Sequence, residues 1–215
     1  MENINKIEIR GKVTKIELKI INTKTLAKMT VVTEYVYTYG GEAKLESTFH
    51  FVEAWENTQV KDLTKIQAGS WVRVVGRYRK KSYKGANGEV VNYMEIFADY
   101  LKKLADNTTE CMNKAELIGA VTKIDLKIVN NNTVGNIQLA TNYVYNSKGE
   151  NVVETTYHYI EAWANPKIKD LAKIRVGTTI RVVGRYRKKS WEDKNGKKQF
   201  KNEIYADELK KIADA

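Results

Sequence analysis

The chain has 215 residues, a formal net charge of +11 and a single cysteine, Cys111. The length allows one or two domains, and the excess of Lys and Arg favours polyanionic partners, because basic side chains release condensed counterions when they meet phosphates. One cysteine excludes an intramolecular disulfide and a cysteine-based metal cluster, and it indicates a cytoplasmic protein. We expect no signal peptide, lipidation site or membrane segment, because polar residues follow Met1 and no long apolar stretch occurs.

The sequence consists of one module that occurs twice. Each residue of the first copy has its counterpart 108 positions further along, as Trp55 and Trp163 show. The segment Arg73–Ser82 recurs unchanged as Arg181–Ser190. This period exceeds the roughly 20 to 50 residues of stacked repeats, so we predict two duplicated domains rather than a solenoid. The predicted domains are residues 1–106 and 113–215, with residues 107–112 as their linker.

The apolar pattern predicts three strands at the start of each copy. Ile7–Ile20 alternates in part and is interrupted at Gly11, which is typical of a long strand that bends at a glycine. A second run, Met29–Tyr39, is rich in Val, Thr and Tyr and ends at Gly40–Gly41. This pattern predicts a hairpin into a third strand, Lys44–Trp55.

A short helix is predicted between the third and fourth strands. In the second copy, Asn165–Pro166 places a capping side chain before a proline at the first helical position. Ile168, Leu171 and Ile174 then recur every third residue until a glycine ends the element. We predict another short helix at Leu101–Leu104, near the end of the first copy.

The rest of each copy predicts two strands and, with them, the fold. Trp71–Tyr83 leads through Asn87–Gly88 into a fifth strand around Val90–Phe97, and Asn195–Gly196 repeats this hairpin signal. Three strands, a short helix and two strands follow the order of an OB-fold, a five-stranded Greek-key barrel that binds oligonucleotides on a sheet face and its loops. Other small β-barrels share parts of this order. We therefore predict an all-β chain of two tandem OB-folds.

Aromatic residues gather on one face of the third strand. Alternation places Phe49 and Trp55 on the same face. In the second copy that face carries Tyr157, Glu161 and Trp163. Because hydroxyls and a carboxylate are costly to bury unpaired, we favour an exposed platform on which bases stack, with core packing as the alternative. On the opposite face, one histidine per copy is expected to be packed rather than to bind a metal.

The fourth strand carries a row of basic side chains that ends in an aromatic residue. The row is Arg73, Arg77, Arg79, Lys80, Lys81 and Tyr83 in the first copy, and Arg181, Arg185, Arg187, Lys188, Lys189 and Trp191 in the second. Cations that follow phosphates, next to rings that stack on bases of any sequence, suit a single strand of nucleic acid. A solvated hairpin arm, whose charges only prevent edge pairing, is the alternative.

Several segments resemble bacterial single-stranded DNA-binding proteins. Asn113–Gly119 is similar to the opening strand of that family, and so is Asn5–Gly11. Thr156–Trp163 and Val182–Arg185 resemble later strands, and the similarity spans nearly the whole of each copy. Most bacterial relatives carry one OB-fold per chain and form tetramers, whereas a few carry two and form dimers. This chain resembles the second kind.

The resemblance also implies a binding site and a function. In the family, aromatic residues stack on bases at positions that match Tyr145, Tyr157, Trp163 and Trp191 and, by the repeat, Tyr37, Phe49, Trp55 and Tyr83. It implies a non-enzymatic, nucleoid-associated homodimer without cofactors that coats single-stranded DNA during replication, recombination or repair. Family members usually end in an acidic tail that recruits repair proteins. This chain ends at Lys210–Ala215, so we do not expect such recruitment.

Two other functions stay open from the sequence. One is a protein-interaction module in which the aromatic strands form a subunit interface, and the other is binding of single-stranded RNA. An enzyme is not expected, because acidic residues shared by both copies, such as Glu8, Glu53 and Asp62, fall on different predicted elements. The chain also has no nucleophile motif, phosphate-binding glycine loop or zinc-ligand spacing.

Overall fold

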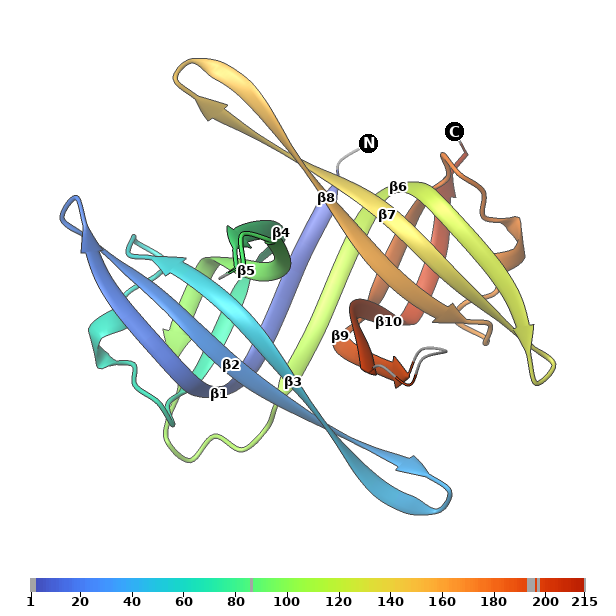
Figure 1. Cartoon of the computed structure of the whole chain (residues 1–215), viewed down its shortest axis with the longest axis horizontal. Coiled ribbons are helices and arrows are strands. Elements are labelled where there is room, and N and C mark those ends of the chain that lie inside the picture. Colours follow the sequence, from blue (N-terminus) through green and yellow to red (C-terminus); the bar gives the residue numbers. More distant parts are fainter. Residues whose placement is uncertain (1–2, 86, 193–195, 197, 215) are drawn as a thin grey trace. The chain divides into compact units, whose positions relative to one another are not determined.

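Strands account for almost all regular structure in the computed structural model, which describes residues 3–85, 87–192, 196 and 198–214 (Figure 1). The chain divides into two units. The N-terminal unit holds Lys6–Asn113, and the C-terminal unit holds Met1–Asn5 and Lys114–Ala215. The limits predicted for the two domains and their linker stay predictions. No helix among the described residues is long and apolar enough to cross a membrane.

Each unit is a barrel of five strands. The N-terminal barrel contains β1 (Ile4–Ile21), β2 (Lys24–Tyr39), β3 (Glu42–Trp55), β4 (Trp71–Lys84) and β5 (Val90–Lys103). The C-terminal barrel contains β6 (Met112–Val129), β7 (Asn132–Ser147), β8 (Glu150–Trp163), β9 (Thr179–Glu192) and β10 (Lys198–Ala213). Along the N-terminal barrel the order is β1, β2, β3, β5, β4, and β4 pairs back with β1. β3 and β5 pair in parallel, whereas β1–β2, β1–β4, β2–β3 and β4–β5 are antiparallel. The C-terminal barrel repeats the arrangement, which confirms the predicted tandem OB-fold.

Glycines allow the long strands to turn the corners of the barrel. β1 pairs with β4 over Ile7–Lys12 and with β2 from Lys12 onward, so it changes partners beside Gly11. A Cβ atom on Gly11 would collide with the carbonyl oxygen of Val32. On β4, the register shifts at Gly76, where a Cβ would collide with the carbonyl oxygen of Phe97. Glycine is therefore required at both bends because the neighbouring backbone lies too close for a side chain.

The barrel interior combines aliphatic packing with a buried polar group. Apolar side chains that alternate along the strands are fully buried, as Ile9 and Val74 show. His50 lies among them, with its ring nitrogens 3.0 Å from Thr33 Oγ1 and 3.3 Å from Tyr78 Oη. Burial lowers the pKa of His50 to about 3, so the ring is neutral. No group of His, Cys, Asp and Glu in the described parts of the chain is placed to hold a metal ion.

The helix predicted between the third and fourth strands is a single 3-10 turn in each unit, η1 (Leu63–Lys65) and η2 (Leu171–Lys173). Asn165 does not cap η2, because its side-chain oxygen accepts a hydrogen bond from the N–H of Lys167, 2.8 Å away, in an earlier turn. Ile168, Leu171 and Ile174 are all buried. Their spacing therefore reflects three anchors of an irregular segment rather than one face of a helix.

The helix predicted at Leu101–Leu104 is wrong. Leu101–Lys103 forms the end of β5, and Leu101 pairs with Val74 of β4. Leu101 is also buried against the barrel. Pairing with β4 supplies the backbone hydrogen bonds that a helix would otherwise supply, and the interior receives the leucine from an extended strand.

Candidate nucleic-acid interface

The aromatic side chains of β3 and β8 point away from the barrel interior. Phe49 is 56% exposed and Tyr157 is 51% exposed, whereas the alternating residues Val52 and Ile160 are buried. Strand alternation thus separates an outer aromatic face from the core, and core packing of these rings is excluded. Rings that present their faces to solvent are available to stack on other π systems.

A buried carboxylate holds the tryptophan of this face in the N-terminal unit. Glu53 accepts a hydrogen bond from Trp55 Nε1 at 3.0 Å and forms an ion pair with the Arg79 guanidinium. Arg79 also donates from Nε to Glu95 at 2.8 Å. Burial alone raises the pKa of Glu53, but the bond from Trp55 and the charges of Arg79 and Lys81 outweigh it and lower that pKa. Glu53 is therefore ionised and fixes both neighbours.

The C-terminal unit builds the same network. Glu161 accepts from Trp163 Nε1 at 2.9 Å and from Arg187 at 2.6 Å, and it also contacts Lys189. Arg187 lies 2.9 Å from Glu203 as well. Burial raises the pKa of Glu161, but the hydrogen bonds from Lys189 and Trp163 and the charges of Arg187 and Lys189 outweigh burial. The pKa of Glu161 is therefore below its ordinary value. Glu161, which the sequence marked as costly to bury, is buried and paired, and so is Glu53.

The arginines predicted to bind phosphates lie in ion pairs within their own unit. Arg73 is 2.7 Å from Glu8, and Arg77 is 2.8 Å from Asp99. The Arg77 guanidinium also lies over the Phe97 ring, 4.6 Å from its centroid. The corresponding ion pairs in the C-terminal unit are Arg181–Glu116 at 2.6 Å and Arg185–Asp207 at 3.0 Å. A phosphate would compete with these carboxylates, and contact between the arginines and phosphates stays a prediction.

Two predicted stacking residues lie on long ribbons beyond the barrel. The β2–β3 and β7–β8 hairpins project from their barrels (Figure 1). Tyr37 stacks on Tyr35 with ring centroids 6.3 Å apart, and Tyr145 does the same with Tyr143 at 5.9 Å. Tyr37 pairs with Lys44 in an unbroken register, so it faces the side of the ribbon opposite Phe49. The structure therefore groups Phe49 with Trp55 but places the ribbon tyrosines on the other side.

Sequence reasoning missed Tyr93 on β5. Its ring centroid lies 5.9 Å from Phe51 at an interplanar angle of 82°, and 5.9 Å from Tyr83 at 60°. These three residues, which we call the aromatic ladder, connect β3 with β4 through edge contacts. A two-residue turn at Asn87–Gly88 would pair Tyr93 with Ser82, but the observed loop pairs it with Lys81. The face of Tyr93 thus depends on a loop length that the Asn-Gly signal does not define.

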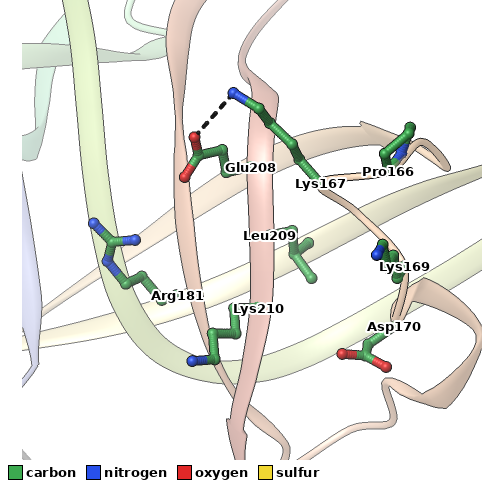
Figure 2. A pocket seen from close by; sticks show the side chains of 8 residues that line it. All are labelled: Pro166, Lys167, Lys169, Asp170, Arg181, Glu208, Leu209 and Lys210. Carbon is green, nitrogen blue, oxygen red and sulfur yellow. Dashed lines mark hydrogen bonds and ion pairs between the residues drawn. The ribbon is translucent and has the colours of Figure 1, made fainter.

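A hollow of about 380 Å³ lies beside β10 in the C-terminal unit (Figure 2). Lys167 and Glu208 form an ion pair at 3.3 Å on its rim, and Arg181 lies on its other side. The counterpart of Glu208 is Tyr100, whose ring lies 5.7 Å from the Arg73 guanidinium. The hollow mixes acids with bases, so it does not extend the basic row as an anion-binding surface.

Solved structures share this fold. The wild-type single-stranded DNA binding protein from Thermus aquaticus aligns with a TM-score of 0.73 at 16% identity, covering 100% of this chain and 96% of its own. A deletion mutant of that protein gives 0.74 at 16% identity, with 100% and 97% covered. A Plasmodium falciparum SSB complex with ssDNA covers 49% of this chain and 99% of its own, at 25% identity and a TM-score of 0.43. At 16% identity, the Thermus similarity establishes the fold.

The sequence itself matches a family model twice. The model of the Single-strand binding protein family matches residues 4–104 and again residues 112–212. The first match runs from the start of β1 past the end of β5, and the second begins with β6 and reaches into the last residues of β10. The chain therefore belongs to the single-strand binding protein family and carries the module of that family twice.

Proposed function

We propose that this chain is a non-enzymatic protein that binds single-stranded DNA with little sequence preference and protects it during replication, recombination or repair. Membership of the single-strand binding protein family supports this proposal. The observation that carries it is the outward aromatic face, present in both units beside basic side chains. Base stacking is tolerant of sequence because every base has a π face.

The exposed side chains suggest which residues contact the bases and which contact the backbone. Phe49 and Tyr157 offer ring faces, while Glu53 keeps the Trp55 indole in one orientation. A ring that is already held in place loses little conformational entropy when a base stacks on it. In this proposal, the aromatic face positions the bases and nearby cations neutralise the backbone.

The arginine side chains differ in how far they are exposed to solvent. The Arg73 and Arg181 side chains are 42% and 38% exposed, whereas that of Arg79 is 15% exposed. We therefore assign phosphate contact to Arg73, Arg181 and the exposed lysines Lys80 and Lys188. Arg79 and Arg187 instead brace the aromatic face through their carboxylate partners.

Two binding surfaces on one chain make the second binding event intramolecular. Once one unit engages a strand, the other binds at an effective concentration set by the connecting chain. We propose further that two chains form a homodimer, which would carry four barrels. Molar mass in solution, with and without a long oligo-dT, tests this assembly, and a monomer under both conditions would contradict it.

Tryptophan fluorescence during titration with oligo-dT tests the proposed function. Stacking of bases on Trp55 and Trp163 is expected to quench the emission, and binding is expected to weaken steeply with salt. RNA and duplex DNA of equal length, titrated in parallel, show which nucleic acid is preferred. Tighter binding of RNA would redirect the proposal to RNA. Unchanged fluorescence and no binding of any strand would leave the aromatic face as a protein interface.

A further inference from the structure

The outer faces of the two barrels differ at one position of the last hairpin. Tyr93 on β5 corresponds to Lys201 on β10. Each lies directly opposite a lysine of the preceding strand, Tyr93 opposite Lys81 and Lys201 opposite Lys189. The two side chains therefore occupy the same place on equivalent sheets, and an aromatic ring in one unit is a cation in the other.

In the N-terminal unit, this position completes the aromatic ladder. Tyr93 contacts Phe51 and Tyr83 through edge-to-face geometry, with both centroids 5.9 Å away. Phe51 and Tyr83 are themselves exposed. The ladder thus presents adjacent ring surfaces from β3 to the tip of β4, and neighbouring bases of a strand can stack along it.

In the C-terminal unit, Lys201 interrupts that path. Its Nζ lies 4.8 Å from the centroid of the Tyr159 ring, the counterpart of Phe51. Lys201 also faces Lys189 across the β9–β10 pair, and like charges directly opposite each other are unfavourable. In such a cation–π contact the lysine remains charged, so Lys201 can still attract an anion.

The carboxylates near Lys201 are shared with other cations. Glu161 contacts Arg187 and Lys189, and Glu203 contacts Arg187 and, at 3.8 Å, Lys201. Three cations therefore share two carboxylates in this ion-paired cluster. An additional anion would balance the charge.

In the equivalent cluster of the N-terminal unit, ion pairs join two cations to two carboxylates. Arg79 and Lys81 pair with Glu53 and Glu95. This unit carries a further cation on β2 instead, as Lys28 opposite Glu53. The corresponding residue of the C-terminal unit is Asn136. The third cation beside the two carboxylates thus lies on β2 in the N-terminal unit and on β10 in the C-terminal unit.

We propose that the two units hold a nucleic-acid strand by different means. The N-terminal unit stacks bases along the aromatic ladder, and the C-terminal unit takes a backbone phosphate between Lys189 and Lys201. This inference rests on the binding of single-stranded DNA proposed above. A phosphate between the two lysines supplies the anion that their cluster lacks and relieves their mutual repulsion.

A reciprocal exchange in the full chain tests this inference. Tyr93→Lys and Lys201→Tyr each insert the residue that the other barrel already carries at that place, so both variants are expected to fold. Affinity for a dT oligonucleotide is measured over a series of salt concentrations. The log–log slope is expected to steepen by about 0.7 in Tyr93→Lys and to flatten by about 0.7 in Lys201→Tyr, one phosphate contact each.

A second probe separates stacking from charge. An abasic oligonucleotide of equal length retains the phosphates and lacks the bases. Tyr93→Lys is expected to lower the preference for dT over the abasic strand, and Lys201→Tyr to raise it. Tyr93→Gln removes the ring without adding charge, so it is expected to lower the preference and leave the salt slope unchanged. This variant also keeps the test independent of how well Tyr93→Lys folds.

Matched controls change the net charge elsewhere on the surface. Gln67→Lys adds a cation just after η1, and Lys65→Gln removes one at the end of η1. Both positions lie outside the β4–β5 hairpin. Salt slopes that shift as much in these controls as in the exchanges would overturn the inference, because the effect would then be general. Unchanged slopes and base preference in the exchanges, with normal binding by the unaltered chain, would overturn it too. Failure of the unaltered chain to bind any strand would instead refute the proposed function.

Discussion

The interiors of the two barrels share a buried polar contact, whereas their outer faces differ in charge at one position. Inside, His50 bonds to Thr33 as His158 bonds to Thr141, at 3.0 and 2.9 Å. Outside, the position of Tyr93 holds a lysine in the C-terminal unit. Buried positions exchange one apolar side chain for another, as Ile7 and its counterpart Ala115 or Val31 and Leu139 show. The exposed position of Tyr93 exchanges a ring for a charge, because a side chain in contact with water changes its chemical type without disturbing the packing.

The largest effect is expected from the tryptophans that both outer faces share. Replacing Trp55 and Trp163 together with Ala removes two stacking surfaces, each of which contributes about 1 to 3 kcal/mol per base. The affinity for oligo-dT is measured by titration. If both faces bind, the two single variants should each lose part of this affinity. Trp→Phe at both positions serves as the control, since it keeps a ring. Unchanged binding by the Ala double variant would contradict base stacking on the tryptophans.

The buried carboxylates provide a sharper comparison of the two units. Glu161→Gln leaves Arg187 and Lys189 short of one charged partner, in a cluster that already has an excess of cations. Hydrogen bonds to charged groups contribute about 1.5 to 3 kcal/mol, so we expect a loss of that order in the free energy of unfolding. Glu53→Gln should cost less, because the ion pairs of its cluster involve two cations rather than three. Urea denaturation measures both, and an equal or reversed order would contradict the assigned charge balance.

The bends of the first strands should respond alike in both barrels. Gly11→Ala and Gly119→Ala place a Cβ against the carbonyl oxygens of Val32 and Ala140. Overpacking of this kind typically costs about 1 to 3 kcal/mol. Urea denaturation of the two variants measures the cost. A loss in one barrel only would show that the interiors are less similar than the contacts indicate.

The pH dependence of the buried histidines should also be alike in the two barrels. Burial lowers the pKa of His50 and of His158 to about 3 from an ordinary value of 6.5. Below pH 6.5 the unfolded chain binds protons that the folded chain does not, so the free energy of unfolding falls as the pH falls from 6.5 towards 3. Each histidine contributes about 1.4 kcal/mol per pH unit where it is fully protonated when unfolded. Urea denaturation from pH 7 to 5 should show a smaller slope for His50→Gln and for His158→Gln, by equal amounts. A slope unaffected by either change would contradict neutral burial.

Local patterns predicted the strands and their turns well. The hairpin at Gly40–Gly41 follows from sequence because the glycines adopt positive φ angles that other residues rarely adopt. The alternation of Phe49 and Val52 likewise follows from strand geometry alone. The errors lie where a distant partner decides. Leu101 extends because β4 offers it hydrogen bonds, and Ile168 lies in an irregular segment because the barrel buries its side chain.

The sequence by itself determined the duplication, the barrel class and the family, and it favoured an outward aromatic face on the third strand. These features depend on local periodicity and on residues close to one another in the chain. Only the tertiary structure decided which cations remain available. Arg79 meets Glu53 and Glu95 because a parallel pairing brings β3 beside β5, and the loop before β5 turns Tyr93 onto the aromatic ladder. Ion pairs and ring contacts form between strands that are far apart in sequence, so spacing alone does not reveal them.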